Sequence, residues 1–175
     1  MDRQELAEQL QATCRIQGHF VLRSGQAANV YFDKYLFEAD PRLLRAVAEQ
    51  CVPLVPSGTE VLAGLELGGV PVSTALSMLT GLPQVLVRKQ AKTYGTAKLA
   101  EGMEINGRRA LVVEDVITTG GQVVASTLEL RNRGALVTSV LCVIDRRPTG
   151  AGLDKLGEAG LSLVSLFTAD DLGGV

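Results

Sequence analysis

The stretch LVVEDVITTGG, residues 111–121, decides the fold class of this 175-residue chain. It opens with an apolar run typical of a buried strand, continues with the adjacent acids Glu114 and Asp115, and closes in a turn of threonines and glycines. A helix is predicted next over residues 122–133, followed by Gly134 at a position where glycine commonly ends a helix. A strand, a small-residue turn and a helix in this order indicate one unit of a parallel α/β sheet.

The same alternation of strands and helices continues on both sides of this stretch. Further strands are predicted at residues 61–64, 84–87, 136–144 and 162–166, a helix at 70–79, and a long polar stretch without periodicity at 88–106. Because the strands are apolar on both faces, they need helices on both sides. We therefore expect an α/β fold with a doubly wound, mainly parallel, five-stranded sheet, whose ligands bind beyond the carboxyl ends of its strands.

The first 40 residues are predicted to form a small N-terminal hood. The sequence predicts a helix with a capping box over residues 2–13, two short strands around a Ser-Gly turn over 20–35, and a helix with proline in its first turn over 41–51. The length suits one domain, and no linker or repeat divides the chain. We expect a single domain over residues 1–175, with the hood, residues 1–40, as part of it.

Composition excludes several classes of protein. A net charge of −2, no long basic run and 4% aromatic residues without tryptophan argue against nucleic-acid binding. Three widely spaced cysteines, Cys14, Cys51 and Cys142, and the single His19 favour a reduced, cytoplasmic compartment over a disulfide framework or a multi-histidine metal site. The uncharged residues 67–87 are long enough to span a membrane, but three glycines and two prolines interrupt them, so we expect buried core instead.

The acid pair and the turn together indicate a ligand with both a phosphate and a diol. Backbone N–H groups of a glycine-rich turn and a helix N-terminus form an anion site, and carboxylates beside it suit sugar hydroxyls or a divalent cation. No lysine follows the glycines and no GxGxxG motif is present, which argues against a nucleotide-binding P-loop or a dinucleotide site. The alternative is a plain strand-to-helix turn with a solvated acid pair.

At this point the chain resembles a known family. The segment VVEDVITTGGQ, residues 112–122, is similar to the 5-phosphoribosyl 1-pyrophosphate (PRPP) motif of the type I phosphoribosyltransferases. FVLRSG at 20–25, YFD at 31–33, VRKQAKTYG at 87–95 and DR at 145–146 resemble segments of the orotate phosphoribosyltransferases within it. The likeness covers about residues 18–147. The chain departs from many members with Arg23 in place of lysine and Tyr94 in place of histidine, and from some with Leu67-Gly68 in place of Tyr-Lys.

The resemblance implies a Mg²⁺-dependent pentosyltransferase that converts orotate and PRPP to orotidine 5′-monophosphate and pyrophosphate in pyrimidine biosynthesis. It places catalysis on Lys92, Asp115 and Lys89, with Lys92 as the main cation for the leaving group. Substrate-binding roles are expected for Arg23, Tyr31, Phe32, Arg88, Lys89, Lys92, Tyr94, Glu114, Asp115, Val116, Ile117, Thr118, Thr119, Gly120, Gly121, Gln122 and Arg146. The acids meet the ribose hydroxyls, residues 118–122 bind the 5′-phosphate, and Thr118 and Arg146 hold orotate. Mg²⁺ is expected near Glu114 and Asp115, held through PRPP and water and not by direct protein ligation.

The cations at positions 88, 89 and 92 also suit pyrophosphate on chemical grounds, although a short charge run is often only a solvated face. The resemblance implies a homodimer in which the loop 88–102 acts across the interface. Two alternatives remain open. A purine or uracil phosphoribosyltransferase would share the PRPP loop, and a PRPP-sensing regulator would bind without catalysis, typically with a DNA-binding extension. The sequence leaves open the turnover rate, the preference for orotate, the lid conformation and any association with the decarboxylase that follows in the pathway.

Overall fold

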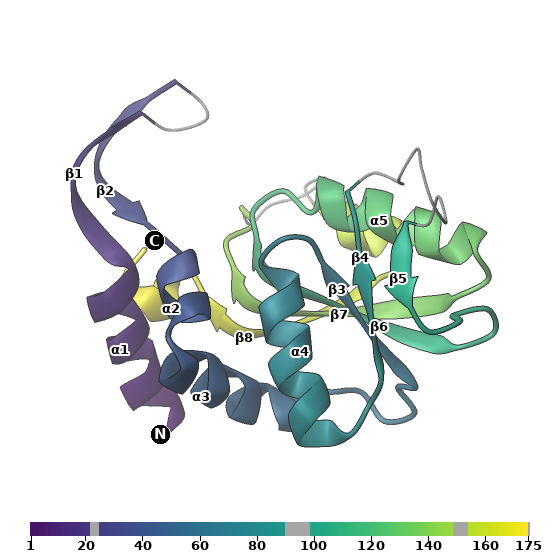
Figure 1. The fold of residues 1–175 in the computed structure, drawn as a ribbon. Coiled ribbons are helices and arrows are strands. Elements are labelled where there is room, and N and C mark those ends of the chain that lie inside the picture. Colours follow the sequence, from purple (N-terminus) through teal and green to yellow (C-terminus); the bar gives the residue numbers. More distant parts are fainter. Residues whose placement is uncertain (22–24, 90–98, 149–153, 175) are drawn as a thin grey trace.

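A six-stranded sheet forms the centre of the part of the chain that the computed structural model describes, residues 1–21, 25–89, 99–148 and 154–174 (Figure 1). Its strands are β3 (Val61–Leu65), β4 (Gln84–Val87), β5 (Ala100–Gly102), β6 (Arg109–Ile117), β7 (Leu136–Asp145) and β8 (Ser162–Thr168). They lie in the order β5-β4-β3-β6-β7-β8, and every neighbouring pair is parallel except β4 and β5. The five predicted parallel strands are confirmed, but the predicted total of five is wrong, because the short edge strand β5 adds a sixth.

Helices cover both faces of the sheet, as a doubly wound fold requires. α1 (Arg3–Cys14), α3 (Pro41–Cys51) and α4 (Gly69–Thr80) lie on one face, and α5 (Gly121–Asn132) and α6 (Lys155–Glu158) lie on the other (Figure 1). Alternate residues of β6 supply the two cores: Leu111 and Val113 belong to the first and Val112 to the second. This double burial explains the unbroken apolar runs of the central strands.

The N-terminal segment forms the expected hood. Asp2 accepts a hydrogen bond from the Glu5 N–H at 2.9 Å, and Glu5 accepts one from the Asp2 N–H at 3.0 Å, which confirms the capping box. β1 (Arg15–Val21) and β2 (Ala27–Phe32) form an antiparallel hairpin that projects from the body (Figure 1). The short helix α2 (Tyr35–Ala39), which was not predicted, leads back to the sheet.

Two short 3₁₀ turns complete the fold, Val52–Leu54 after α3 and Asp170–Leu172 after β8. Arg3 ties the second of these regions to α1, because it donates hydrogen bonds to the Leu166 carbonyl at 3.2 and 3.0 Å and forms an ion pair with Asp171 at 3.0 Å. The first helix is thereby fastened to the last strand of the sheet.

The remaining sequence-based expectations concern buried thiols and the long uncharged segment. Cys14, Cys51 and Cys142 are free and buried, in α1, α3 and β7 respectively. Residues 67–87 form a turn, the helix α4 and the strand β4, as the glycines and prolines predicted. Among the described residues, none of the helices has the length and apolar character needed to cross a membrane.

Candidate active site

The chain reverses its direction of winding between β3 and β6. From β3 it proceeds through α4 to β4 on one side, and from β6 through α5 to β7 on the other. Ligands of open α/β sheets bind at such a switch point, beyond the carboxyl ends of the two strands. Here those ends carry the turn at residues 66–69 and the acid-to-glycine segment 114–121.

The two acids lie inside β6 and not after it. The apolar run that predicts this strand ends at Val113, but the ladder of β6 with β7 continues through the pairs Glu114–Cys142 and Ile117–Asp145. Both carboxyl side chains are therefore taken into the protein, with Glu114 9% exposed and Asp115 fully buried. A solvated acid pair, the alternative left open by the sequence, is excluded by this burial.

Asp115 is the centre of a cluster of charged side chains. Its Oδ1 accepts a 2.6 Å hydrogen bond from the Val116 N–H, and its Oδ2 forms an ion pair with Lys34, which immediately precedes α2. Its own N–H donates to Glu114 Oε1 at 3.1 Å. Glu38 of α2 completes the cluster, since a Cβ placed on Gly68 would lie 1.7 Å from Asp115 Oδ2 and 2.6 Å from Glu38 Oε1.

Burial and mutual contact shift the pKa values of the three carboxyl groups in opposite directions. Burial, reinforced by Asp115, raises the pKa of Glu38 to about 8 and that of Glu114 to about 9. For Asp115, burial alone would raise the pKa, but hydrogen bonds with Glu114 and Glu38 and the charge of Lys34 outweigh it and lower the pKa. These opposite shifts favour negative charge on Asp115, beside the ammonium group of Lys34, and protonation of Glu38 and Glu114.

The turn after β6 has uncapped backbone N–H groups of the kind that the predicted anion site requires. Thr118 and Thr119 are exposed, Gly120 has a φ of 72°, and α5 begins at Gly121 without a side-chain cap. The first N–H groups of α5 are therefore left without a capping side chain, next to the positive end of the helix dipole. Gln122 is exposed and donates to Ser126 Oγ at 3.2 Å. Thr118 to Gln122 thus lie together at the carboxyl edge of the sheet.

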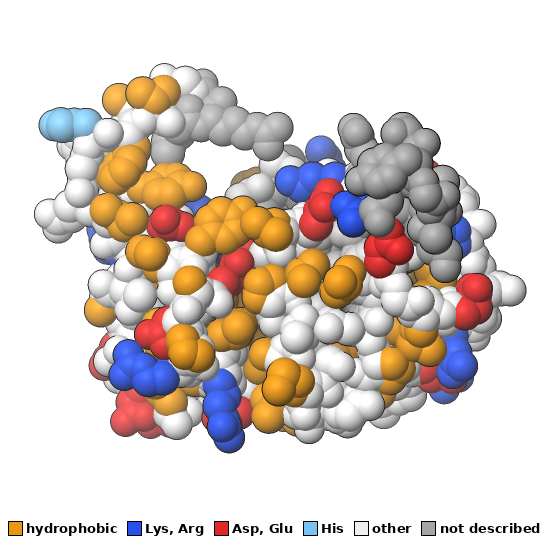
Figure 2. Space-filling model, viewed as in Figure 1, with side chains coloured by type: hydrophobic (Ala, Val, Ile, Leu, Met, Phe, Trp, Pro, Cys, Tyr) orange, Lys and Arg blue, Asp and Glu red, His pale blue; other side chains and the backbone are white. Residues whose placement is uncertain are grey.

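The base of the predicted catalytic loop is fixed to the same edge. Glu66, directly after β3, accepts a 2.5 Å hydrogen bond from the Lys89 N–H. Arg88 donates its N–H to the Leu99 carbonyl at 2.9 Å, and its side chain pairs with Glu101 at 3.7 Å. Three predicted site residues, Arg23, Lys92 and Tyr94, lie outside the described residues. Figure 2 shows basic and acidic side chains side by side along the upper edge of the molecule.

The two neighbouring aromatics of the hairpin differ in their surroundings. Tyr31 is 44% exposed and its ring lies 5.5 Å from that of Phe20. Phe32 is 8% exposed and packs in the core, so a contact of its side chain with substrate stays a prediction. Of the other predicted contacts, Val116 is half-buried and Ile117 is buried, so each offers a ligand chiefly its backbone.

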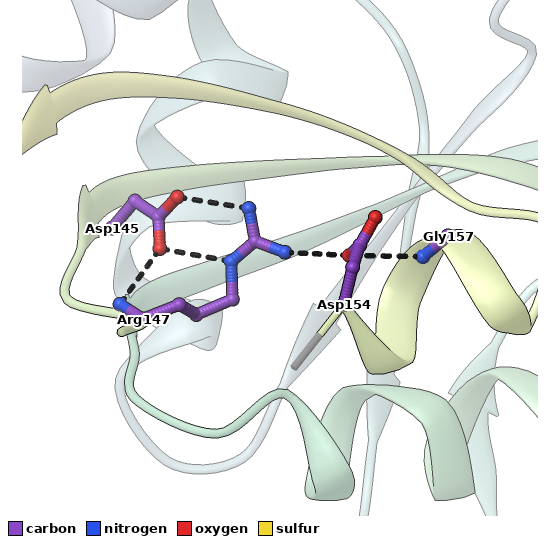
Figure 3. A network of polar contacts seen from close by, with 4 residues as sticks. All are labelled: Asp145, Arg147, Asp154 and Gly157. Atoms are coloured by element: carbon purple, nitrogen blue, oxygen red, sulfur yellow. Dashed lines mark hydrogen bonds and ion pairs between the residues drawn. The ribbon is translucent and has the colours of Figure 1, made fainter. Parts of the chain in front are cut away.

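The two arginines after β7 also take different positions. Arg146 is exposed, its N–H donates to the Ile117 carbonyl at 2.8 Å, and its side chain has no hydrogen bond or ion pair with the described residues. Arg147 instead donates from Nε and Nη2 to the two oxygens of Asp145, each at 3.0 Å, and pairs with Asp154 at 3.0 Å (Figure 3). Arg147 therefore fastens β7 to α6, which leaves Arg146 available at the edge of the site.

Sequence reasoning missed Lys34, Glu38 and Gly68. Lys34 precedes the five-residue helix α2 and Glu38 lies in it, and both meet Asp115 only through the fold. Gly68 was noted in the sequence, but its role was left open; the contacts above show that it admits the acid cluster close to its backbone. One sequence signal separates the exposed Tyr31 from the buried Phe32: strand alternation places neighbouring side chains on opposite faces.

Comparison of the whole chain with known proteins gives consistent results. No family model matches it. The orotate phosphoribosyltransferase of Nocardioides sp. is 55% identical over 167 residues, which cover 95% of this chain and 92% of that protein. The orotate phosphoribosyltransferase of Halobacterium salinarum is 43% identical over 169 residues, covering 96% and 95% of the two chains.

Solved structures agree with these relatives. The Mycobacterium tuberculosis orotate phosphoribosyltransferase in complex with Fe(III) dicitrate has a TM-score of 0.86 and 35% identity, covering 99% of both chains. The same enzyme in complex with PRPP has a TM-score of 0.82 and 32% identity over 99% of both chains. The adenine phosphoribosyltransferase of Thermoanaerobacter pseudethanolicus, at 18% identity and a TM-score of 0.67, shows the same fold only.

Proposed function

The chain belongs to the orotate phosphoribosyltransferase family, and from that membership we propose how its own residues carry out the transfer. The reaction of this family joins orotate to the phosphoribosyl group of PRPP, releases pyrophosphate, and supplies orotidine 5′-monophosphate for pyrimidine biosynthesis. The observation that carries the assignment of the site is the buried acid pair of β6 next to the uncapped N-terminus of α5, at the switch point of the sheet.

PRPP spans this edge of the sheet in our proposal. Its 5′-phosphate accepts hydrogen bonds from the residues 118–122, where threonine hydroxyls and uncapped N–H groups are available. Its ribose lies over Glu114 and Asp115. Its pyrophosphate lies toward Arg88 and Lys89, which follow β4, the neighbour of β3.

The chemical step replaces one bond at the anomeric carbon. The bond from that carbon to the pyrophosphate oxygen breaks, and the ribose acquires oxocarbenium character. A ring nitrogen of orotate then forms a bond to the carbon and loses its proton to water. Positioning and charge stabilisation are the main requirements of such a step. Asp115 faces the positive charge of the ribose, and Lys92, aided by Arg88 and Lys89, neutralises the leaving pyrophosphate.

The cluster fits a Mg²⁺ ion that arrives with PRPP. Both oxygens of Asp115 are already engaged by protein groups, and among the described residues no group of three or more His, Cys, Asp and Glu side chains could hold a metal ion. We propose that PRPP oxygens and water hold the ion near Glu114 and Asp115. The ion would supply neutralisation of negative charge on the pyrophosphate.

We assign the orotate carboxylate to Arg146. Its side chain is exposed at the carboxyl end of β7, adjacent to β6, and an arginine fork suits a carboxylate. Thr118 and Tyr31 are the further residues that we place against the base. Thr118 is exposed at this edge of the sheet, and Tyr31 is exposed on the hood. We also propose a cytoplasmic location, which the free and buried state of the three cysteines supports.

A homodimer with the loop 88–102 acting across its interface is the remaining part of the proposal. The hairpin supports it, because two-stranded ribbons are marginally stable alone and this one leaves Val21 82% and Tyr31 44% exposed. A second copy of the chain would cover such a surface. Sedimentation of the purified protein tests the oligomeric state.

One assay tests the function directly. Orotate absorbance is followed on mixing the protein with PRPP, Mg²⁺ and orotate, and a decrease is expected only when all are present. Asp115→Asn should weaken PRPP binding in calorimetry while the protein stays folded. Binding of PRPP without any loss of orotate would overturn the choice of base and favour a purine, uracil or non-catalytic alternative.

A further inference from the structure

Lys34 directly follows the segment YFD at residues 31–33, and it is the cation that contacts Asp115. We propose that Lys34 is a positioning residue for the transfer reaction: it fixes the orientation and the charge of the Asp115 carboxylate that faces the ribose. The inference rests on the function proposed above.

The geometry restricts Asp115 to one orientation. The Val116 N–H holds Oδ1 at 2.6 Å and Lys34 holds Oδ2, so rotation of the carboxylate would break at least one of these contacts. The backbone of Gly68 closes the space beside Oδ2. Asp115 itself has no exposed surface, whereas the Lys34 side chain is 29% exposed.

Lys34 is in turn held by its surroundings. It directly precedes α2, and its ammonium group lies 5.3 Å from the centroid of the Tyr35 ring, a cation–π contact. Among the described ion pairs, Asp115 is its partner, while the other acids near it, Glu114 and Glu38, have no ion pair with a cation.

The ammonium group of Lys34 keeps the negative charge of the cluster on Asp115. Two buried carboxyls, those of Glu114 and Asp115, meet the half-buried carboxyl of Glu38, and their mutual repulsion opposes ionisation of all three. Without Lys34, a proton could pass from a neighbouring carboxyl to Asp115. A neutral Asp115 would accept a ribose hydroxyl more weakly and would no longer stabilise a positive ribose.

A different role for Lys34 makes the opposite prediction. If Lys34 only occupies the place of substrate and is displaced by PRPP, its removal should tighten PRPP binding, because the competing ion pair is gone. If it positions Asp115, its removal should weaken binding and slow turnover. The two roles can therefore be distinguished by the sign of one measured change.

The test uses the full chain with Lys34→Met, Lys34→Arg and the control Arg45→Met, which removes an exposed cation of α3 paired with Glu49. PRPP affinity with Mg²⁺ is measured by calorimetry, and kcat by orotate absorbance. Loss of a charge-assisted contact predicts a kcat about 10- to 100-fold lower and weaker PRPP binding for Lys34→Met. Lys34→Arg should recover part of both, and Arg45→Met should match the wild type.

A double-mutant cycle shows whether Lys34 acts through Asp115. In the Asp115→Asn background, Lys34→Met should change kcat less than about threefold, because the group it positions has already lost its charge. If Lys34→Met alone does not fold, Lys34→Arg is compared in the wild-type and Asp115→Asn backgrounds instead, and its effect should again be smaller in the second. Tighter PRPP binding, wild-type kinetics in Lys34→Met, or an equal effect in both backgrounds would overturn the proposal. A wild type without orotate turnover would refute the function itself.

Discussion

Replacement of Gly68 by alanine tests the packing around the acid cluster. The φ of Gly68 is −72°, which alanine adopts without strain, so the effect arises from space alone. The added Cβ would lie 1.7 Å from Asp115 Oδ2, 2.4 Å from its Cγ and 2.6 Å from Glu38 Oε1. Ordinary contacts of a Cβ begin at about 3.4 Å. Something in the cluster must therefore move.

The movement should be costly because Asp115 is held on two sides. Overpacking a filled interior typically costs about 1–3 kcal/mol, and loss of a charge-assisted contact adds about 1.5–3 kcal/mol. We expect Gly68→Ala to lower the free energy of unfolding by about 3–5 kcal/mol. At about 2–4 °C per kcal/mol for a chain of this size, the melting temperature should fall by about 6–20 °C. PRPP binding should weaken at the same time.

Thermal unfolding followed by circular dichroism measures the effect. Gly121→Ala is the stability control, because within the described part of the chain a Cβ there would meet Thr119 Oγ1 alone, at the ordinary contact distance of 3.8 Å. Asp115→Ala removes the two nearest atoms of the clash, so Gly68→Ala should destabilise that background less than the wild type. A melting temperature within about 2 °C of the wild type, or equal losses in both backgrounds, would refute this reasoning.

Three further predictions concern the loop, the cluster and the two arginines. Lys92→Ala should lower kcat by about 100-fold or more with only a modest loss of PRPP affinity, and unchanged turnover would remove Lys92 from catalysis. If the loop acts across a dimer, mixing Lys92→Ala with Asp115→Asn protein should restore activity at one site of each mixed dimer, whereas a loop acting within its own subunit gives none. Burial and Asp115 raise the pKa of Glu38 from 4.5 to about 8, so the folded protein retains a proton that the unfolded chain releases. The free energy of unfolding should therefore decline as pH rises from about 5 to 8. Glu38→Gln should flatten that decline, and an unchanged slope would contradict the assignment. Arg146→Ala should raise the KM for orotate about 10- to 100-fold at an unchanged melting temperature, whereas Arg147→Ala should lower stability by about 1–2 kcal/mol; the reverse pattern would exchange their roles.

The parallel sheet and its site edge could be predicted because each element carries its own signal. The apolar runs at β3, β6 and β7 and the helix after Gly120 depend on local periodicity. β5 was missed because three residues, Ala100–Gly102, contain no period, and they pair with β4 only through the fold. The end of β6 was misplaced because acids disfavour strands, and only the ladder with β7 carries them.

The individual side chains of the site were less accessible to sequence reasoning. Lys34 and Asp115 are 81 positions apart, and no local pattern connects them. Arg146 and Arg147 are adjacent and chemically identical, so only the position of Asp145 and Asp154 separates a structural arginine from an available one. The type of chemistry was therefore predictable from the residues, but the contacts that tune it required the fold.

Alkylation of the three buried thiols would report which parts of the protein unfold first. Burial raises the pKa of Cys14 to about 11 and that of Cys51 to about 12, and it also raises the pKa of Cys142. A thiol that is neither ionised nor accessible reacts with an alkylating reagent only when its surroundings open. Because the three lie in α1, α3 and β7, the order in which mass spectrometry finds them alkylated would show whether the N-terminal helices open before the sheet does.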